Sequence, residues 1–431
     1  MARWFPMVGV LLVILAGSAA ASGEGLRRVV VSGELDPVSG EAFSRFGRAV
    51  INDSGDVAFE GFLEWETYVG ANNDEGLWST FGGLHRVARE NHPMVGGVDW
   101  DTLTGMDLLN SGELIGTCRQ YYPGSADDLR AVWTSRGGSA EVIADTNMDA
   151  GIPQGSFDGQ NLGAGLVGCD GTYFFQARRK DSSGQPYTTF SEPFIATETF
   201  KRLYEGPQLP EGYELHGHTY SPLPARVLPG GVLEHTAVRT VWEEVQQFPD
   251  GPTLSQRRGV HISVWRTDQN GSTMHRELPL AAPGGIVGDL HFDDVEWVGM
   301  NDHGRVIADA WAAQADGSGA VRGVWAETPD GWELVHANTS SNLSMFGRVT
   351  GPDVVLSDNG VWAYPAEFSS DKCLLLDVGL GLKSSAIREG LSTRGLPSEV
   401  TVEQILSYAM SPTGQLVVLA RFVEVTRASS A

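Results

Sequence analysis

Seven segments of this chain share one pattern, a polar turn that ends in glycine followed by a strand of alternating apolar and other positions. The shared glycines lie 54 to 73 residues apart and are Gly55, Gly112, Gly171, Gly231, Gly304, Gly360 and Gly414. A regular period built from strands and turns indicates an array of supersecondary units, because one such unit cannot bury its apolar face alone.

Each unit is expected to contain four antiparallel strands. One strand precedes the turn, for example residues 43–51, and one follows it. An aromatic strand comes next, with Trp78, Trp133, Phe194 or Trp325 lying 21 to 23 residues after the glycine, and Trp265 lies 34 after it because of an insertion. Turns rich in Gly, Asn and Asp then lead into a fourth strand, as expected of tight hairpins.

Seven units of four strands predict an all-β fold, a seven-bladed β-propeller that forms a single domain over residues 22–431. Six or eight blades and an open stack of small sheets are the alternatives. Residues 27–34 match the fourth-strand pattern and residues 415–425 match the strand after the turn. We therefore expect Val29–Val31 to close the ring by pairing with Leu416–Val423.

The N-terminus has the pattern of a secretory signal peptide over residues 1–21. Arg3 precedes an apolar run from Val8 to Leu15, and Ala19 and Ala21 form an Ala-x-Ala cleavage pattern. Ser18 stands where a lipoprotein would carry its lipidated cysteine. The expected product is a secreted or periplasmic protein without an integral membrane anchor, cleaved after Ala21.

Net charge and cysteine content limit the kinds of binding partner that we expect. The formal net charge is −24, which disfavours nucleic acid and anionic membrane surfaces and suits cations or basic partners. Three cysteines, Cys118, Cys169 and Cys373, leave at least one thiol unpaired. We expect a monomer that binds a protein or glycan ligand.

The phrase INDSGDVAFEG, with the GLW and VARE strands that follow it, resembles the bacterial NxxGxxAF tandem-repeat proteins. The motif is complete at Asn52 to Gly55 with Ala58 and Phe59, and it is partial in the other repeats. The resemblance implies an exported repeat protein without an established reaction, so it transfers no catalytic residue. No sorting anchor follows the last repeat in this sequence.

Four residues are candidates for a ligand site or for acid–base chemistry. His216 and His218 would share one face of a strand, with Glu214 before them, and could approach His235 and His291 only through the fold. Asp293 and Asp294 could form a carboxylate pair. The recurring Asn52, Asp53 and Ser54 are instead interpreted as turn residues that bond their own backbone, and the tryptophans as core.

One loop has the spacing of a calcium site. Asp145, Asn147 and Asp149 alternate before Gly151, but Ser156 occupies the twelfth position, where such a loop uses glutamate. We expect weak calcium binding at most, and no other cofactor.

The sequence contains none of the Gly-x-Ser-x-Gly, phosphate-loop, His-Glu-x-x-His or Cys-x-x-Cys motifs. The first hypothesis is a non-enzymatic binding scaffold that uses the insertion Val245–Ser255 as its recognition loop. The second is an extracellular polysaccharide hydrolase or lyase with its site at the channel mouth.

Overall fold

The computed structural model describes strands, turns and bends and no helix in the part of the chain that it covers. Consequently no helix long and apolar enough to cross a membrane occurs there. The described residues are 9–15, 27–64, 74–90, 102–120, 129–135, 140–145, 156–158, 166–167, 173–180, 192–197, 202–205, 225–228, 232–246, 253–268, 271–278, 281–282, 290–301, 303–313, 320–328, 331–338, 355–357, 362–368, 371–377, 383–391 and 400–424.

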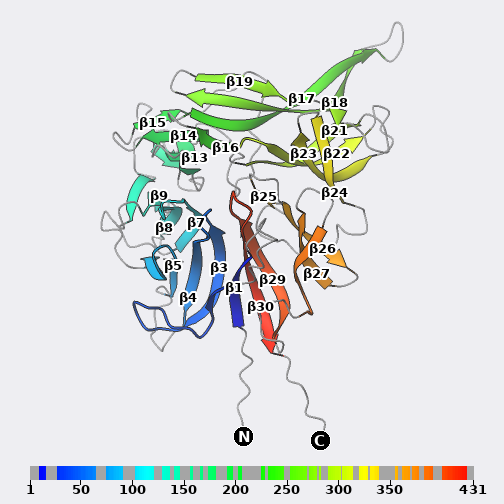
Figure 1. Ribbon diagram of the computed structural model, residues 1–431. Coiled ribbons are helices and arrows are strands. Elements are labelled where there is room, and N and C mark those ends of the chain that lie inside the picture. The colour runs from blue at the N-terminus through cyan, green and yellow to red at the C-terminus, as the bar shows by residue number, and fades with distance from the viewer. Residues whose placement is uncertain are drawn as a thin grey trace, which may run out of the picture. The chain divides into compact units, whose positions relative to one another are not determined.

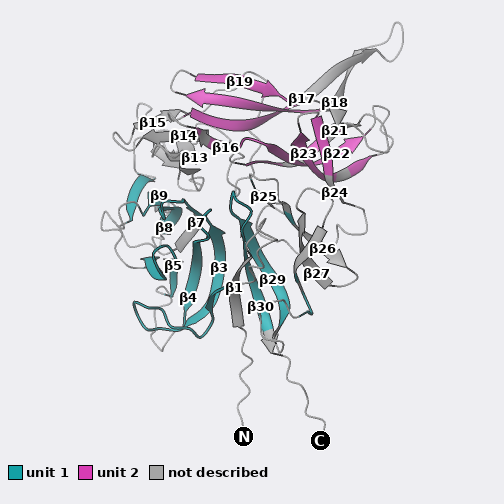
Figure 2. Ribbon diagram, in the orientation of Figure 1, with its two compact units in different colours: residues 1–149, 156–165, 348–431 teal, residues 150–155, 166–347 magenta. Residues whose placement is uncertain are grey.

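The strands form antiparallel sheets of the kind that make β-propeller blades, divided between two compact units (Figures 1 and 2). Unit 1 comprises residues 1–149, 156–165 and 348–431, and unit 2 comprises residues 150–155 and 166–347. Each unit is described separately below.

Unit 1 contains four four-stranded sheets and the short strand β11 (Ser156–Asp158). The first sheet has the order β3 (Phe43–Ile51), β4 (Val57–Leu63), β5 (Glu75–Ser79), β6 (His85–Arg89). The second has the order β7 (Thr102–Leu108), β8 (Leu114–Gln120), β9 (Leu129–Thr134), β10 (Glu141–Asp145). The third has the order β25 (Val355–Leu356), β26 (Trp362–Phe368), β27 (Asp371–Asp377), β28 (Lys383–Arg388). The fourth contains the two ends of the described chain and has the order β29 (Val400–Met410), β30 (Leu416–Glu424), β1 (Gly9–Leu15), β2 (Arg27–Val31).

Unit 2 contains three further sheets. One is built on β13 (Tyr173–Lys180), β14 (Glu192–Thr197) and β15 (Arg202–Glu205), with β12 (Leu166–Val167) paired to β13. The next has the order β16 (Ala225–Leu228), β17 (Val232–Gln246), β18 (Thr253–Asp268), β19 (Gly271–Glu277). The last has the order β20 (Ala281–Ala282), β21 (Leu290–Met300), β22 (Val306–Ala313), β23 (Val321–Thr328), β24 (Gly331–Asn338).

The third-strand tryptophans form the core, as their repeated spacing suggested. Trp78 and Trp133 are fully buried, and Trp265 and Trp325 nearly so. Glycine on the neighbouring strand makes room for two of these rings, because a Cβ atom at Gly61 or Gly116 would lie 2.8 Å from a ring carbon of Trp78 or Trp133. Large aromatic side chains at one place in each sheet fill the space between successive sheets.

The first and last repeats meet within unit 1. Thr413 N, in the last repeat turn, donates to Asp53 Oδ1 at 2.9 Å, and Asp53 also pairs with Asn110 of the second turn through two hydrogen bonds of 2.8 Å. Val417 and Leu419 of β30 share an apolar cluster with Phe43 and Phe59 of the first sheet. These contacts join segments of unit 1 that lie about 360 residues apart in the sequence.

The predicted pairing at the N-terminus was wrong in its detail. Strand β2 does belong to the last sheet, but it pairs with β1, and β1 is the strand that pairs with β30. An apolar run that reads as a leader, Gly9–Leu15, therefore occupies the position between the two strands that we expected to be neighbours.

The 73-residue step between the fourth and fifth glycines corresponds to an extended hairpin. Strands β17 and β18 pair from Leu233↔Thr267 out to Gln246↔Thr253, whereas β16 pairs only with residues 232–235 and β19 only with residues 263–268. The outer part, residues 240–246 and 253–260, is a two-stranded ribbon that extends beyond its sheet (Figure 1). The insertion predicted as a loop thus has strand structure on both sides of residues 247–252, which lie outside the described part.

Candidate functional site

The histidine and carboxylate candidates are only partly described. His216 and His218 lie outside the described residues, and Asp293 lies in β21 without a described side chain. Asp294 is exposed, and its Oδ1 accepts a hydrogen bond from the adjacent Val295 N at 3.0 Å.

The calcium-binding candidate is also described only in part. Asp145 ends β10, while Asn147 and Asp149 lie outside the described residues. Within the described ranges, no group of three or more His, Cys, Asp or Glu side chains could hold a metal ion.

His235, considered as a possible companion of the histidine pair, is a core residue. It is fully buried in β17, and its Nε2 lies 3.1 Å from Thr267 Oγ1. Burial lowers the pKa of His235 to about 4, so the imidazole is neutral at physiological pH. Its environment suits a hydrogen-bonded core side chain and offers no opening to a ligand.

Cys118 is a free thiol buried in β8. Burial raises the pKa of this thiol, and its Sγ contacts Ala131 O at 3.7 Å. A protonated, buried thiol is a poor nucleophile, so Cys118 has the features of a packing residue. Cys169 lies outside the described residues, and the side chain of Cys373 is not described.

The repeat turns show why glycine and asparagine recur. Gly55, Gly112, Gly304 and Gly414 have φ between 78° and 87°, the left-handed region that favours glycine. Asn52 Oδ1 accepts from Ser54 N at 3.0 Å and Asp56 N at 2.9 Å, and Asn301 Oδ1 accepts from Arg305 N at 2.8 Å. These side chains are bonded to their own turns. Gly171, Gly231 and Gly360 lie outside the described residues.

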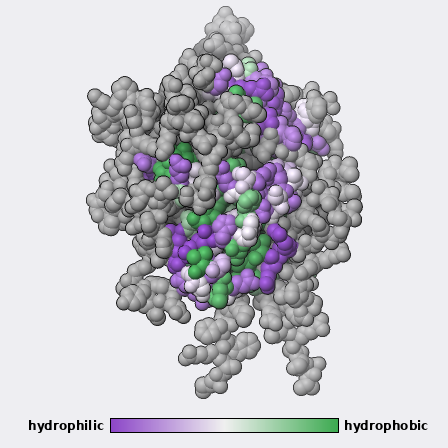
Figure 3. All heavy atoms as spheres, turned by 60° about the vertical axis from the view of Figure 1, so that its left-hand side comes forward, coloured by the Kyte–Doolittle hydropathy of each residue, from purple (hydrophilic) through white to green (hydrophobic). Residues whose placement is uncertain are grey.

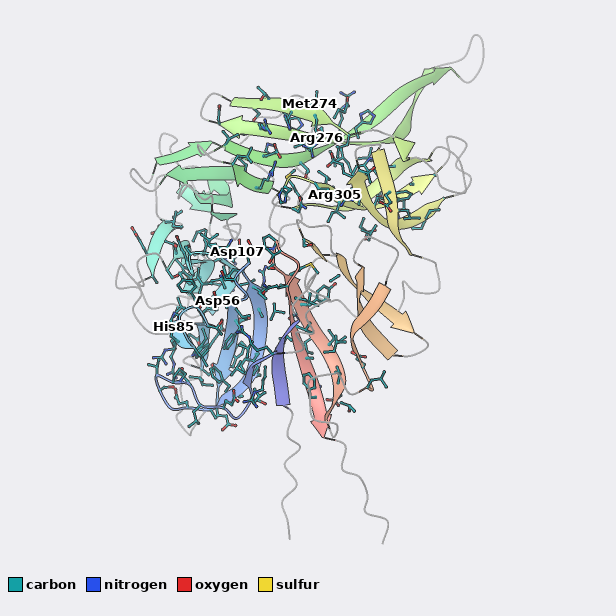
Figure 4. All side chains as sticks on the ribbon, viewed as in Figure 1. Asp56, His85, Asp107, Met274, Arg276 and Arg305 are labelled. Atoms are coloured by element: carbon teal, nitrogen blue, oxygen red, sulfur yellow. The ribbon has the colours of Figure 1, made fainter. Side chains whose placement is uncertain are left out.

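A charged cluster lies where the first and second sheets of unit 1 meet. It comprises Arg48 of β3, Glu60 of β4 and Asp107 of β7 (Asp107 is labelled in Figure 4). The ladder of β3 is bulged between Phe46 and Ala49, and Glu60 Oε2 accepts from Arg48 N at 3.1 Å within this bulge. Bulges of this kind are frequent where a strand aims a side chain at a functional site.

The electrostatics of this cluster combine burial with attraction between opposite charges. Burial lowers the pKa of Arg48, and the nearby Asp107 and Glu60 carboxylates oppose this shift. Burial raises the pKa of Asp107. The hydrogen bond from Leu108 N–H and the charge of Arg48 oppose this shift. Burial thus disfavours the charged forms of Arg48 and Asp107, and the attraction between the two side chains opposes this effect.

A second ionic cluster lies in unit 2 and is structural. The fully buried Glu234 carboxylate accepts from Arg226 at 2.7 Å and from Arg266 at 2.8 Å. Burial opposes ionisation of Glu234, but its bonds to Arg266 and Arg226 outweigh that effect and lower its pKa. The cluster packs over the turn at Gly304, where a Cβ atom would lie 2.6 Å from Arg226 Nη2. It therefore fixes one repeat turn against the preceding sheet.

Sequence reasoning missed two equivalent arginines. Arg27 Nη2 donates to Gly55 O at 2.8 Å, and Arg276 Nη2 donates to Gly304 O at 2.5 Å (Arg276 is labelled in Figure 4). Each arginine lies 28 residues before the turn glycine that it binds. That constant offset was the signal that could have identified them as links between a fourth strand and the next repeat turn.

The β17–β18 ribbon is the second candidate, and its side chains beyond Arg239 are known only from the sequence. It carries Trp242 opposite Arg257 and Val245 opposite Leu254. Tryptophan and arginine are the residue types that most often dominate binding energy at protein interfaces. Elsewhere the described surface mixes hydrophilic and hydrophobic residues, as the face in Figure 3 shows.

Comparison with known proteins gives a partial family match. Residues 17–199 match the family described as "Family of unknown function (DUF7453)". A comparison with curated proteins finds no match.

Among solved structures, the chain is similar to a polysaccharide lyase, an ulvan lyase of family PL25 bound to an oligosaccharide. The identity is 9%, the TM-score is 0.39, and the match covers 88% of this chain and 94% of the lyase. It is also similar to the Dos1 propeller, at 8% identity and a TM-score of 0.36, over 92% of this chain and 84% of that one. A protein of unknown function from Dyadobacter fermentans matches at 12% identity and a TM-score of 0.31, over 75% and 93% of the two chains. None of these likenesses is close enough to transfer an activity.

Proposed function

We propose that this chain is an exported, non-enzymatic β-propeller of seven blades, and that it binds a protein or glycan partner through the β17–β18 ribbon. The leader over residues 1–21 directs export and is removed after Ala21. The first and last sheets, joined through Asp53 and Thr413, close the ring. The mature protein is a monomer without a required cofactor.

The ribbon is the observation that carries this proposal. Residues 240–246 and 253–260 pair only with each other and with no third strand in the described part. A two-stranded hairpin alone is marginally stable in water, and both of its edges offer unpaired backbone groups to another chain. A ribbon on a rigid scaffold, with Trp242, Arg257 and Arg258 in its sequence, suits recognition of a partner.

Replacement of residues 241–259 by Asn-Gly tests the proposal. The two residues would form a tight turn between Thr240 and Val260, which already face each other in the ladder. We expect a folded protein with a nearly unchanged melting temperature that no longer retains partners from the medium of its host. Retention of the same partners by the shortened protein would contradict the assignment.

A polysaccharide hydrolase or lyase stays the alternative prediction. It requires His216, His218, Asp293 and Asp294 to meet at one point. The only one of these side chains that is described, Asp294, bonds to the backbone of its neighbour. No described contact favours this second function.

A further inference from the structure

The segment that forms strand β1 has two roles that exclude each other. Gly9–Leu15 is the apolar core of the expected leader, and it is also an inner strand of the last sheet. It pairs with β30 through seven consecutive positions, from Gly9↔Phe422 to Leu15↔Leu416, without a bulge, and with β2 on its other side. A leader that is recognised and cleaved during export cannot remain in this position.

The position that β1 fills is apolar on both faces. Along β30, Val417 and Leu419 belong to a cluster shared with the first sheet, whereas Leu416, Val418 and Ala420 belong to a cluster shared with Ala363 and Ile387. A strand beside β30 in the same sheet therefore lies between two apolar layers. Strands buried on both faces read as continuous apolar runs, and GVLLVIL is such a run.

Strand β2 is held by contacts that do not involve β1. Val30 is fully buried in the cluster with Phe43, and Arg27 Nη2 donates to Gly55 O at 2.8 Å. Just after the strand, Gly33 N donates to Phe43 O at 2.7 Å. With β2 fixed against the first sheet, loss of β1 leaves a gap of two strand spacings, about 9.5 Å, between β30 and β2.

We propose that removal of residues 1–21 converts the edge of β30 into a strand-acceptor site. Its ligand is an extended, continuously apolar segment of a partner protein, which binds antiparallel to β30 in the place of Gly9–Leu15. The open edge presents a row of unpaired backbone N–H and C=O groups beside apolar surface, the two features used when a peptide adds to a sheet. This inference rests on the proposed export and cleavage, and it concerns a surface separate from the ribbon.

Peptide binding to the chain that begins at Ser22 tests the site directly. The probe is a peptide of residues 9–15 with lysines added at both ends, and its control carries Leu12→Pro, which removes a ladder donor. We expect saturable binding of the probe, slower amide exchange in residues 416–424, and a melting temperature that rises with probe concentration. The proline peptide should produce none of these effects.

The full chain provides a second test that does not depend on folding of the shortened one. With the leader retained, Leu12→Pro should lower the melting temperature by more than about 5 °C and speed exchange in residues 416–424. Ser18→Pro, outside the strand, should leave both unchanged. Equal melting temperatures for the two variants would show that β1 has no structural role and would overturn the proposal.

Two further results would also overturn it. One is protection of residues 416–424 in the shortened chain without any peptide, which would mean that β2 moves inward and closes the gap. The other is self-association of the shortened chain that the probe does not reverse. An uncleaved N-terminus on the exported protein, read by mass spectrometry, would refute the export proposal separately, since the peptide experiments use chains of defined length.

Discussion

Single polar side chains determine the geometry of the repeat turns. Asn52 is 2% exposed, accepts two backbone N–H groups of its own turn, and donates through Nδ2 to Leu109 O of the next repeat at 3.1 Å. Asn52→Ala should destabilise the protein by about 1–3 kcal/mol, because two partly buried backbone donors lose their acceptor and the hydrogen bond to Leu109 O is lost. Urea denaturation measures the loss. Ser54→Ala, at an exposed position of the same turn, should change stability little, and equal effects would contradict this role of Asn52.

The buried His235 leads us to expect that the protein loses stability in acid. Its pKa falls from 6.5 in the unfolded chain to about 4 in the buried site. The unfolded state therefore binds the proton first as the pH drops, and stability declines between pH 6.5 and about 4. From pH 7.5 to pH 5 this group alone should remove about 2 kcal/mol from the free energy of unfolding. Denaturation of His235→Gln at both pH values should show a smaller decline, and an unchanged decline would exclude His235 as its source.

Sequence reasoning worked best for residues whose partners are local. Asn52 was interpreted as a turn residue because its acceptors lie two and four positions away. It gave no sign of the attraction between Arg48 and Asp107, which lie on different sheets, or of the hydrogen bond that Trp78 Nε1 donates to Asp36 Oδ1 at 2.8 Å across 42 residues. Such pairs depend on how sheets pack, which a pattern along the chain does not reveal.

At the level of elements, arginines join one sheet to the turn of the next. Arg276 on β19 bonds Gly304 O and also Glu327 of β23, with Nη2 to Oε2 at 2.9 Å. Arg276→Met and Glu327→Gln should each destabilise the protein, and a double-mutant cycle should give a coupling of about 1–2 kcal/mol. Additive losses, measured by denaturation, would mean that the ion pair does not couple the two sheets.

Elements were predicted well where strand alternation follows a glycine turn. Most turn phrases are followed by the expected strand, as with β4, β8, β22 and β30. Two strand pairings were not predicted. The 245–255 insertion contains Pro, Asp and Gly, so it reads as a loop although its flanks pair with each other. Gly9–Leu15, the apolar run of the expected leader, pairs with β30, a strand at the other end of the sequence that no local pattern indicates.

At the scale of the whole molecule, Asp53 links three repeats of unit 1. Its carboxylate accepts from Asn110 Nδ2 at 2.8 Å and from Thr413 N at 2.9 Å. Asp53→Ala should lower the melting temperature and speed amide exchange both in residues 109–113 and in residues 411–415, since both turns lose an anchor. Glu64→Ala, at an exposed position, is the control. Faster exchange confined to residues near Asp53 would contradict a role in joining the first and last repeats.

Site-specific photo-crosslinking tests the central claim, that the ribbon is where a partner binds. A photoreactive residue is introduced at Trp242 in the ribbon or, as control, at the exposed His85 of β6, and the exported proteins are irradiated in the medium of their host. We predict adducts of defined mass from position 242, absent from position 85 and suppressed by excess unlabelled protein. Equal adducts at both positions, or none at position 242, would contradict the account.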